Sequence, residues 1–235
     1  MVSILAAMPT PMLYFEQSNL IGKLIVMVLL ICSISAWTVM AWKWLTLRNL
    51  HKQNKAQMRQ LSKLDSLCSV SLSQQSTTPA TLSKVFHSGL VAYHQEVRVF
   101  GPPCTDHSRA RCKRNIENAM SREIAKTGIL YENWMTTLGS IVTASPFLGL
   151  LGTVWGVMDA FGSVAQGGNA TLQHLAPGVS GALLTTVAAL LVAIPSVVGY
   201  NYIVTFIKNM IVELENDATE IAEQIEHEID LSDPS

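Results

Sequence analysis

Charged side chains are scarce in this sequence. They make up 14% of its 235 residues, whereas soluble domains usually contain about 25%. Hydrophobic residues make up 49% and are gathered into long runs. This deficit of charge argues against a soluble domain and favours a membrane protein.

The usual signatures of catalytic and metal sites are also missing. The four cysteines include no Cys-x-x-Cys pair, and we expect those of the basic segment to be reduced thiols. Cys104, His107 and Cys112 suggest a metal site but lack a fourth ligand at the usual spacing. We find no Ser/His/Asp constellation and no phosphate-binding glycine loop. The sequence therefore predicts neither an enzyme nor a cofactor.

Three uncharged or nearly uncharged runs are long enough to cross a bilayer. The first, Leu24 to Trp42, has 19 residues, which as a helix span about 28 Å. Between Asn133 and Ile207 the only formal charge is Asp159, and a short glycine-rich stretch divides this region into two further spans. The predicted segments are a short N-terminus (1–19), a first span (20–44), a helical loop (45–131), a second span (132–163), a turn (164–176), a third span (177–207) and an acidic helical tail (208–235).

The distribution of charge predicts the orientation of these spans. Fourteen of the 16 lysines and arginines lie between Lys43 and Lys126, and nine of the 17 acidic residues follow Lys208. Because basic loops stay on the cytoplasmic side, we expect the N-terminus outside and the loop and tail in the cytoplasm. A cluster within the loop also allows nucleic-acid binding, although the positive-inside rule already accounts for it: Arg109, Arg111, Lys113 and Arg114.

Helical periodicity continues outside the membrane. Asp106 or Ser108 is expected to cap a loop helix that runs on into the second span, because only Gly128 interrupts it. The tail carries an apolar seam at heptad-like spacing, which packs either on the basic loop helices of its own chain or on those of a neighbour. The seam consists of Ile207, Ile211, Leu214, Ala218, Ile221 and Ile225.

Glycines mark the second span. Gly149, Gly152 and Gly156 are three and four residues apart, so they share one helix face, and Thr153 lies beside that face. Small residues at this spacing let membrane helices approach closely. Small residues are abundant on the third span as well, which suits packing between subunits and predicts a homo-oligomer.

The middles of the spans contain hydroxyls where ion pathways usually have titratable groups. The hydroxyls are those of Thr143, Thr153, Thr185 and Thr186. Threonine can bond a carboxyl group or water but does not titrate at physiological pH. If ions cross here, another polypeptide must supply the titrating group. The alternative is that these threonines satisfy carbonyls of their own helices.

Two segments resemble the TolQ/ExbB/MotA proton-channel family, and the TolQ/ExbB branch in particular. They are the run from Gly149 to Met158 and the run from Ala176 to Asn201, which contains Pro177-Gly178 and Ile194-Pro195. The resemblance implies an all-α integral membrane protein with three transmembrane helices and long cytoplasmic helical extensions. It also implies a pentameric bundle in the inner membrane of a Gram-negative-type bacterium.

The resemblance further implies a mechanism. The pentamer would surround helices of a single-span ExbD- or TolR-like partner whose membrane aspartate carries the proton past Thr153 and Thr186. The work would pass to a TonB- or TolA-like protein that spans the periplasm. The residues expected to shape the pore or pack its helices are Gly149, Gly152, Gly156, Pro177, Gly178, Gly181, Thr185 and Pro195.

One position departs from the branch. Gly181 stands five residues before Thr186, where TolQ and ExbB proteins usually have glutamate. The choice between H⁺ and Na⁺, and between envelope maintenance and nutrient uptake, therefore stays open. A MotA-like flagellar stator is disfavoured because that branch usually has four spans. A structural membrane scaffold that passes no ions is the alternative from another class.

Overall fold

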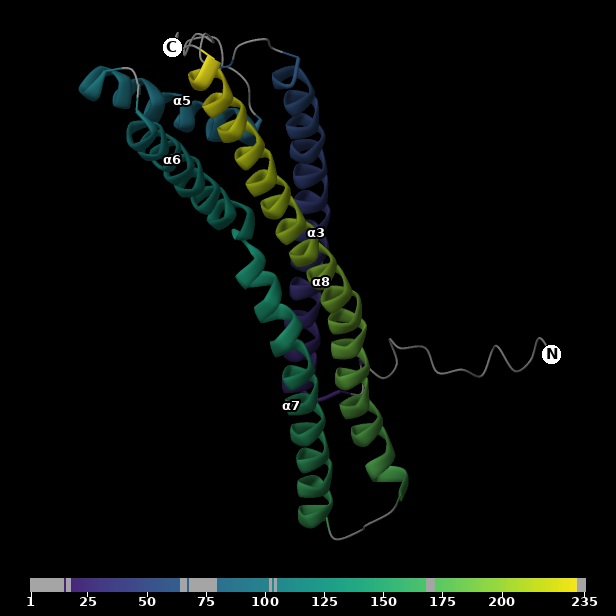
Figure 1. Cartoon of the computed structure of the whole chain (residues 1–235). Coiled ribbons are helices and arrows are strands. Elements are labelled where there is room, and N and C mark those ends of the chain that lie inside the picture. Colours follow the sequence, from purple (N-terminus) through teal and green to yellow (C-terminus); the bar gives the residue numbers. More distant parts are fainter. Residues whose placement is uncertain are drawn as a thin grey trace, which may run out of the picture. The chain divides into compact units, whose positions relative to one another are not determined.

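The computed structural model of the chain describes residues 15, 18–63, 67, 80–101, 103, 105–167 and 172–231. The regular elements within these residues are all helical, as predicted. Most of the expected N-terminal segment (1–19) and of the polar loop before Thr81 lies outside the described residues. The helices are α3 (Leu20–Leu61), α5 (Thr81–Phe100), α6 (Asp106–Glu132), α7 (Met135–Gly167) and α8 (Leu172–Leu231) (Figure 1).

Three of these helices are long and apolar enough to cross a membrane, which confirms the predicted number of spans. They lie within Leu20–Leu61, Met135–Ala165 and Leu175–Ile229. Each helix extends past its expected span. The first continues without a break to Leu61, and only residues 168–171 separate α7 from α8, where a longer turn was expected.

The chain divides into two compact units. Unit 1 consists of Met1–Trp42 and Trp134–Tyr202, and unit 2 consists of Lys43–Asn133 and Ile203–Ser235. Unit 1 therefore contains the uncharged part of each span, and unit 2 contains the charged helices.

Unit 1 has an apolar core shared by its three helical segments. Ile25 and Leu29 of α3 are buried with Ala189 and Val192 of α8, and Leu148 of α7 packs against them. The start of α3 is fixed by an N-cap, since the Asn19 side-chain oxygen accepts a hydrogen bond from the Gly22 backbone N–H at 2.7 Å. Many other apolar side chains of these segments are exposed, as expected for helices that face lipid or neighbouring helices.

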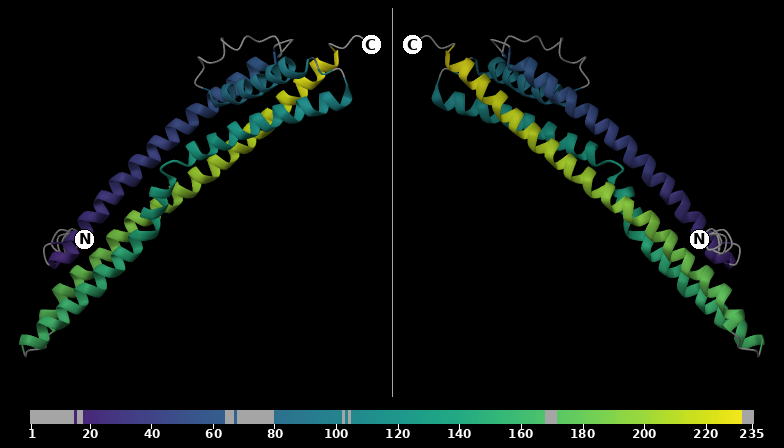
Figure 2. Two further views of the ribbon diagram at one scale, coloured as in Figure 1. Left: turned by 90° about the vertical axis from the view of Figure 1, so that its left-hand side faces the viewer. Right: turned by 90° about the vertical axis from the view of Figure 1, so that its right-hand side faces the viewer.

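The prediction that the loop helix continues into the second span is wrong. The helix α6 ends at Glu132, and a new helix, α7, begins at Met135 (Figure 2). Trp134 between them has a φ of +69°, a left-handed conformation that is costly for a bulky residue. On the α6 side, Lys43 Nζ donates to the Tyr131 carbonyl at 3.0 Å, satisfying one of the carbonyls that a helix end leaves unpaired. The residues between the two helices, Asn133 and Trp134, include neither the glycine nor the proline that usually marks a helix end in a sequence.

The third span and the tail form one continuous helix. The helix α8 starts five residues before Pro177 and runs for 60 residues through both Pro177 and Pro195 (Figure 1). Next to Pro195, the buried Ser196 hydroxyl donates to the Val192 carbonyl at 2.7 Å. In α7 a serine precedes the proline, and the hydroxyl of Ser145, before Pro146, donates to the Ile141 carbonyl at 2.6 Å. Neither hydroxyl bonds the carbonyl that loses its N–H donor to the proline, which is that of Leu191 for Pro195 and that of Val142 for Pro146.

Unit 2 is closed by interactions between its helices. The cap of α6 is Thr105, not Asp106 or Ser108 as expected, and Thr105 and Ser108 form a reciprocal capping box. At the other end of α6, the Tyr131 and Thr81 hydroxyls lie 2.7 Å apart and connect α6 to α5. A side chain at Gly89 of α5 would run into Met120 of α6.

The tail seam packs on helices of its own chain. Ile207, Leu214, Ile221 and Ile225 are buried. A Cβ atom at Gly128 of α6 would touch Ile211 at 3.4 Å. The sequence left open whether this seam packs within the chain or on a neighbour. In the structure it packs within the chain.

Candidate functional site

The glycine face of α7 is buried against α8 of the same chain. A Cβ atom built at Gly149 would lie 2.5 Å from the Ala189 Cβ atom, and one at Gly156 would lie 2.6 Å from the Ala182 Cβ atom. Real Cβ atoms do not approach so closely, so glycine is required at both positions. We expected the small residues to serve packing between subunits, whereas this row of glycines serves packing within the subunit.

The other two contacts of this seam complete an antiparallel register. Gly152 of α7 faces Thr185 of α8, and Gly178 of α8 faces Ala160 of α7, where a Cβ atom at residue 178 would lie 3.0 Å from that of the alanine. Small residues on one helix thus face small residues or threonine on the other at every turn. The two backbones approach closely along this seam, as in other small-residue membrane interfaces.

The carbonyl of Gly149 is the meeting point of the predicted threonines. Thr185 and Thr186 of α8 both direct their hydroxyls to it, each with an Oγ1–O distance of 3.1 Å. In a helix the same carbonyl accepts the backbone N–H of the residue four positions on, which is Thr153. Thr153 and Thr186, the expected ion-pathway pair, are therefore both placed within one helical turn of Gly149.

The four threonines differ in their surroundings. Thr185 is fully buried and also contacts the Ala182 carbonyl at 2.7 Å. Thr153 and Thr186 are only partly buried, so their side chains reach the surface of the chain. Thr153 donates to the Leu150 carbonyl at 2.8 Å and Thr143 to the Gly139 carbonyl at 3.0 Å, both in their own helix. The hydroxyls of Thr143 and Thr153 thus bond carbonyls of their own helix, which is the alternative role considered above. The hydroxyls of Thr185 and Thr186 instead connect α8 to α7.

The unusual glycine at residue 181 has a structural counterpart in the segment before α3. The Ser18 hydroxyl donates to the Gly181 carbonyl at 3.2 Å. A Cβ atom at residue 181 would lie 2.9 Å from Ser18 Oγ and 3.0 Å from Ser18 Cα. A glutamate at residue 181 would have to displace the backbone of Ser18. The sequence alone did not predict this long-range contact between Ser18 and Gly181.

A cavity opens beside this contact, between the starts of α3 and α8 and the last turns of α7. Its volume is about 200 Å³. Its polar lining comes from Asn19, Asp159 and Ser163, and glycines and alanines form the rest. In the sequence Asp159 is only an isolated charge, because no local pattern predicts that Asn19 lies near it.

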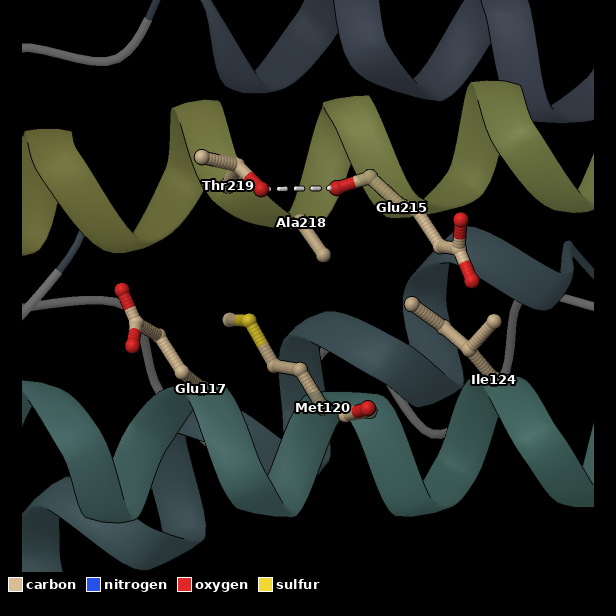
Figure 3. Close-up of a pocket in the computed structure, with 7 residues that line it drawn as sticks. Glu117, Met120, Ile124, Glu215, Ala218 and Thr219 are labelled. Atoms are coloured by element: carbon tan, nitrogen blue, oxygen red, sulfur yellow. Dashed lines mark hydrogen bonds between the residues drawn. The ribbon is translucent and has the colours of Figure 1, made fainter.

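A second cavity, of about 360 Å³, lies between α6 and α8 in unit 2 (Figure 3). Met120, Ile124 and Ala218 lie between the two helices in this view, with Glu117 and Glu215 at the sides. The Thr219 hydroxyl donates to the Glu215 backbone carbonyl at 3.0 Å, so it is satisfied within α8. Among the groups of the lining, the Thr219 hydroxyl therefore needs no ligand as a hydrogen-bond partner.

The other residues that the sequence singled out have structural roles in unit 2. Arg111 pairs with Glu96 at 2.6 Å, and Lys113 pairs with Glu226 at 2.6 Å. Arg109 also donates to the Pro103 carbonyl at 3.4 Å. Three of the four basic residues thus interact within the chain, which favours a structural role over nucleic-acid binding. Cys112 is buried, and burial, with a contribution from Glu96, raises the pKa of its thiol to about 11. Such a thiol is a poor metal ligand, and Cys104 lies outside the described residues.

Comparison with known proteins identifies relatives of this chain. The sequence model of the MotA/TolQ/ExbB proton channel family matches residues 79–216. The biopolymer transport protein ExbB of Pseudomonas putida is 30% identical over 188 residues, which cover 80% of this chain and 54% of that protein. The chain thus spans about half the length of this relative. The Tol-Pal system protein TolQ of Haemophilus influenzae is 29% identical over 189 residues, covering 80% of this chain and 81% of that protein.

The family model covers more than half of the chain, including α7, most of α8 and the whole seam between them. The described residues contain three helices long and apolar enough to cross a membrane, as a membrane channel subunit requires. This chain therefore belongs to the MotA/TolQ/ExbB proton channel family.

Proposed function

We propose that this chain is the channel subunit of an ion-driven motor of the TolQ–TolR or ExbB–ExbD type. Five copies assemble in the bacterial inner membrane, with the N-terminus in the periplasm and the tail in the cytoplasm. The segregation of basic residues between Lys43 and Lys126 supports this orientation. The assembly couples the proton motive force to a TonB- or TolA-like protein, for transport across the outer membrane or for envelope maintenance.

The observation that carries the proposal is the pair of partly buried threonines around one carbonyl. Thr186 donates to the Gly149 carbonyl, and Thr153 is the next residue on that face of α7. Between residues 134 and 158 and between 175 and 202, the sequence contains no Asp, Glu, Lys, Arg or His. A proton pathway along these helices needs a carrier from elsewhere, which an aspartate on a single-span partner supplies. The hydroxyls serve as hydrogen-bond partners for that carboxyl group.

The driving force is adequate for this role. One elementary charge crossing the membrane releases about 2.3 kcal/mol per 100 mV. That energy biases a conformational equilibrium by more than tenfold, since 1.4 kcal/mol corresponds to a factor of ten. Passage of single protons past Thr153 and Thr186 thus suffices to drive a stepwise movement of the partner against the pentamer.

Native mass spectrometry of the complex extracted from its own host tests the assembly. The expected mass corresponds to five copies of this chain and two copies of a single-span protein with a membrane aspartate. A homo-oligomer without such a partner would remove the proton carrier and favour the structural scaffold.

Proton flux in liposomes that contain the complex tests the pathway itself. Thr186→Val and Thr153→Ala should each reduce flux at least tenfold while the complex keeps its mass. Thr143→Val is the matched control, because Thr143 is exposed and lies ten residues before Thr153, about 15 Å along the helix. Unchanged flux in the Thr153 and Thr186 variants would contradict the pathway.

A further inference from the structure

Asp159 is an isolated charge in unit 1. Lys23 and Asp159 are the only formal charges among the residues of unit 1 that the structure describes. No lysine or arginine lies within ion-pair distance of Asp159 in the described part of the chain. The Asp159 side chain is exposed and lies four residues before the end of the expected second span. A charged residue in a membrane-spanning helix usually has a partner or a function.

The one described hydrogen bond to this carboxylate comes from Asn19. The Asn19 Nδ2 atom donates to Asp159 Oδ2 at 3.4 Å, which is long for a hydrogen bond. The orientation of the amide is fixed by the other end of the side chain, because Asn19 Oδ1 accepts the Gly22 N–H that begins α3. The NH₂ group therefore faces Asp159, but a neutral amide does not balance the negative charge.

The space next to this carboxylate is suited to water and a small cation. The cavity of about 200 Å³ that Asp159 lines has room for several water molecules. Ser163, on the same wall, donates its proton to the Ala160 carbonyl at 2.8 Å, which leaves its oxygen lone pairs available. A carboxylate offers about four acceptor positions, and the long bond from Asn19 occupies one of them. Oxygen acceptors of this kind suit hydronium or an alkali cation.

The position of the cavity relates it to the threonines. Asp159 is six residues beyond Thr153 on α7, which is about 9 Å along the helix axis. Gly181, on the opposite wall, precedes Thr186 by five residues, or about 7.5 Å. Both helices thus place the cavity one to two turns from the hydroxyls, toward the connection between α7 and α8.

We propose that Asp159, with Ser163 and the cavity they line, is a collecting site for a small monovalent cation, hydronium or sodium, at the outer end of the pathway. The carboxylate raises the local cation concentration before the ion reaches Thr153 and Thr186. This inference rests on the proposed channel function, because a collecting site has a purpose only where ions pass.

The first experiment measures transport by the complex of this chain and its partner in liposomes, as a function of outer proton or sodium chloride concentration. Asp159→Asn should raise the half-saturating cation concentration about tenfold, equivalent to about 1.4 kcal/mol, with a maximal rate within about twofold of wild type. Asp159→Glu should stay near wild type. The matched control is Glu123→Gln, which removes a carboxylate on α6 outside the site. Overlapping saturation curves for Asp159→Asn and wild type would overturn the inference.

The second experiment separates this inference from the channel proposal. Infrared difference spectroscopy of the purified chain follows carboxylate bands on addition of sodium chloride or on a change of pH. A band that responds in wild type and is missing in Asp159→Asn supports the site, and the effective addition identifies the cation. Identical difference spectra would overturn it. If wild type transports no ion at all, the channel proposal fails and these spectra alone decide the collecting site.

Discussion

The Thr185 side chain of α8 fills the space over the Cα atom of Gly152 in α7, where any larger residue would have its Cβ atom. Thr185 is fully buried there, and its hydroxyl contacts the Gly149 carbonyl one turn away. The packing of the two helices and the placement of the hydroxyls are therefore one arrangement. A change in the seam is expected to disturb the pathway residues as well.

Gly152→Ala should destabilise the protein. The added methyl group collides with Thr185, and overpacking of this kind typically costs about 1–3 kcal/mol. Thermal unfolding in detergent, followed by circular dichroism, measures the effect. Gly162→Ala is the control, because a Cβ atom there meets nothing within 4 Å. Equal loss of stability in the two variants would contradict the role of the seam.

Thr185→Val and Thr186→Val should separate packing from ion passage. Thr185 is buried, so its variant loses a connection between helices, which in membrane proteins is worth about 0.6 kcal/mol on average. Thr186 is partly exposed, so its variant should retain stability better and lose proton flux. Parallel unfolding and flux measurements test this. The prediction fails if Thr186→Val loses as much stability as Thr185→Val does, or no more proton flux.

Gly181→Glu should destabilise the start of α3, since the new side chain meets the Ser18 backbone at about 3 Å. Adding Ser18→Ala should not restore stability, because Ser18 Cα and N cause the conflict as well as Oγ. Gly162→Glu introduces the same charge where space is open and serves as the control. An unfolding temperature unchanged from wild type in Gly181→Glu would show that Ser18 gives way freely.

Lys43→Met should destabilise unit 2. The Lys43 side chain is 5% exposed and donates to the Tyr131 carbonyl near the end of α6. Removing the donor leaves a buried carbonyl with one partner fewer, at a cost of about 1–3 kcal/mol. Limited proteolysis near residue 133 and thermal unfolding report the loss. Lys52→Met, at an exposed position of the same helix, should behave like wild type.

Asp217 predicts a pH dependence of stability. Burial, with repulsion from Glu213 and Glu220, raises the pKa of its carboxyl group from 3.8 to about 6 in the folded chain, and Lys55 opposes the shift. The folded state then holds a proton that the unfolded state releases. The free energy of unfolding should therefore fall as pH rises from about 4 to about 6. Asp217→Asn should match wild type near pH 4 and exceed its stability at pH 7. A variant with the same pH dependence as wild type would contradict this assignment.

The sequence predicted the parts of the fold that depend on local composition. Three apolar runs gave three spans, and the spacing of Gly149, Gly152 and Gly156 gave a close helix contact. It did not give the antiparallel register that sets these glycines against Ala189, Thr185 and Ala182, because either helix alone is compatible with several registers. The contact of Ser18 with Gly181 joins residues 163 positions apart, and no local pattern encodes it.

Helix ends were predicted least well. Trp134 ends the helical path without glycine or proline, since tertiary contacts such as that of Lys43 with the Tyr131 carbonyl stabilise the break. Pro195 is the opposite case. Proline usually breaks a helix in water, yet α8 continues through Pro195. Membrane helices tolerate proline because neighbouring helices and local adjustments of the backbone compensate for the hydrogen bond that proline removes.

The continuity of α8 has a structural consequence. The helices α3 and α8 both pass from the apolar unit to the charged unit without leaving helical geometry, whereas α6 and α7 are separated at Asn133 and Trp134. The residues of α8 beside Thr186 and those of the acidic tail therefore belong to one hydrogen-bonded helix, whereas the helical path between α6 and α7 is interrupted at Asn133 and Trp134.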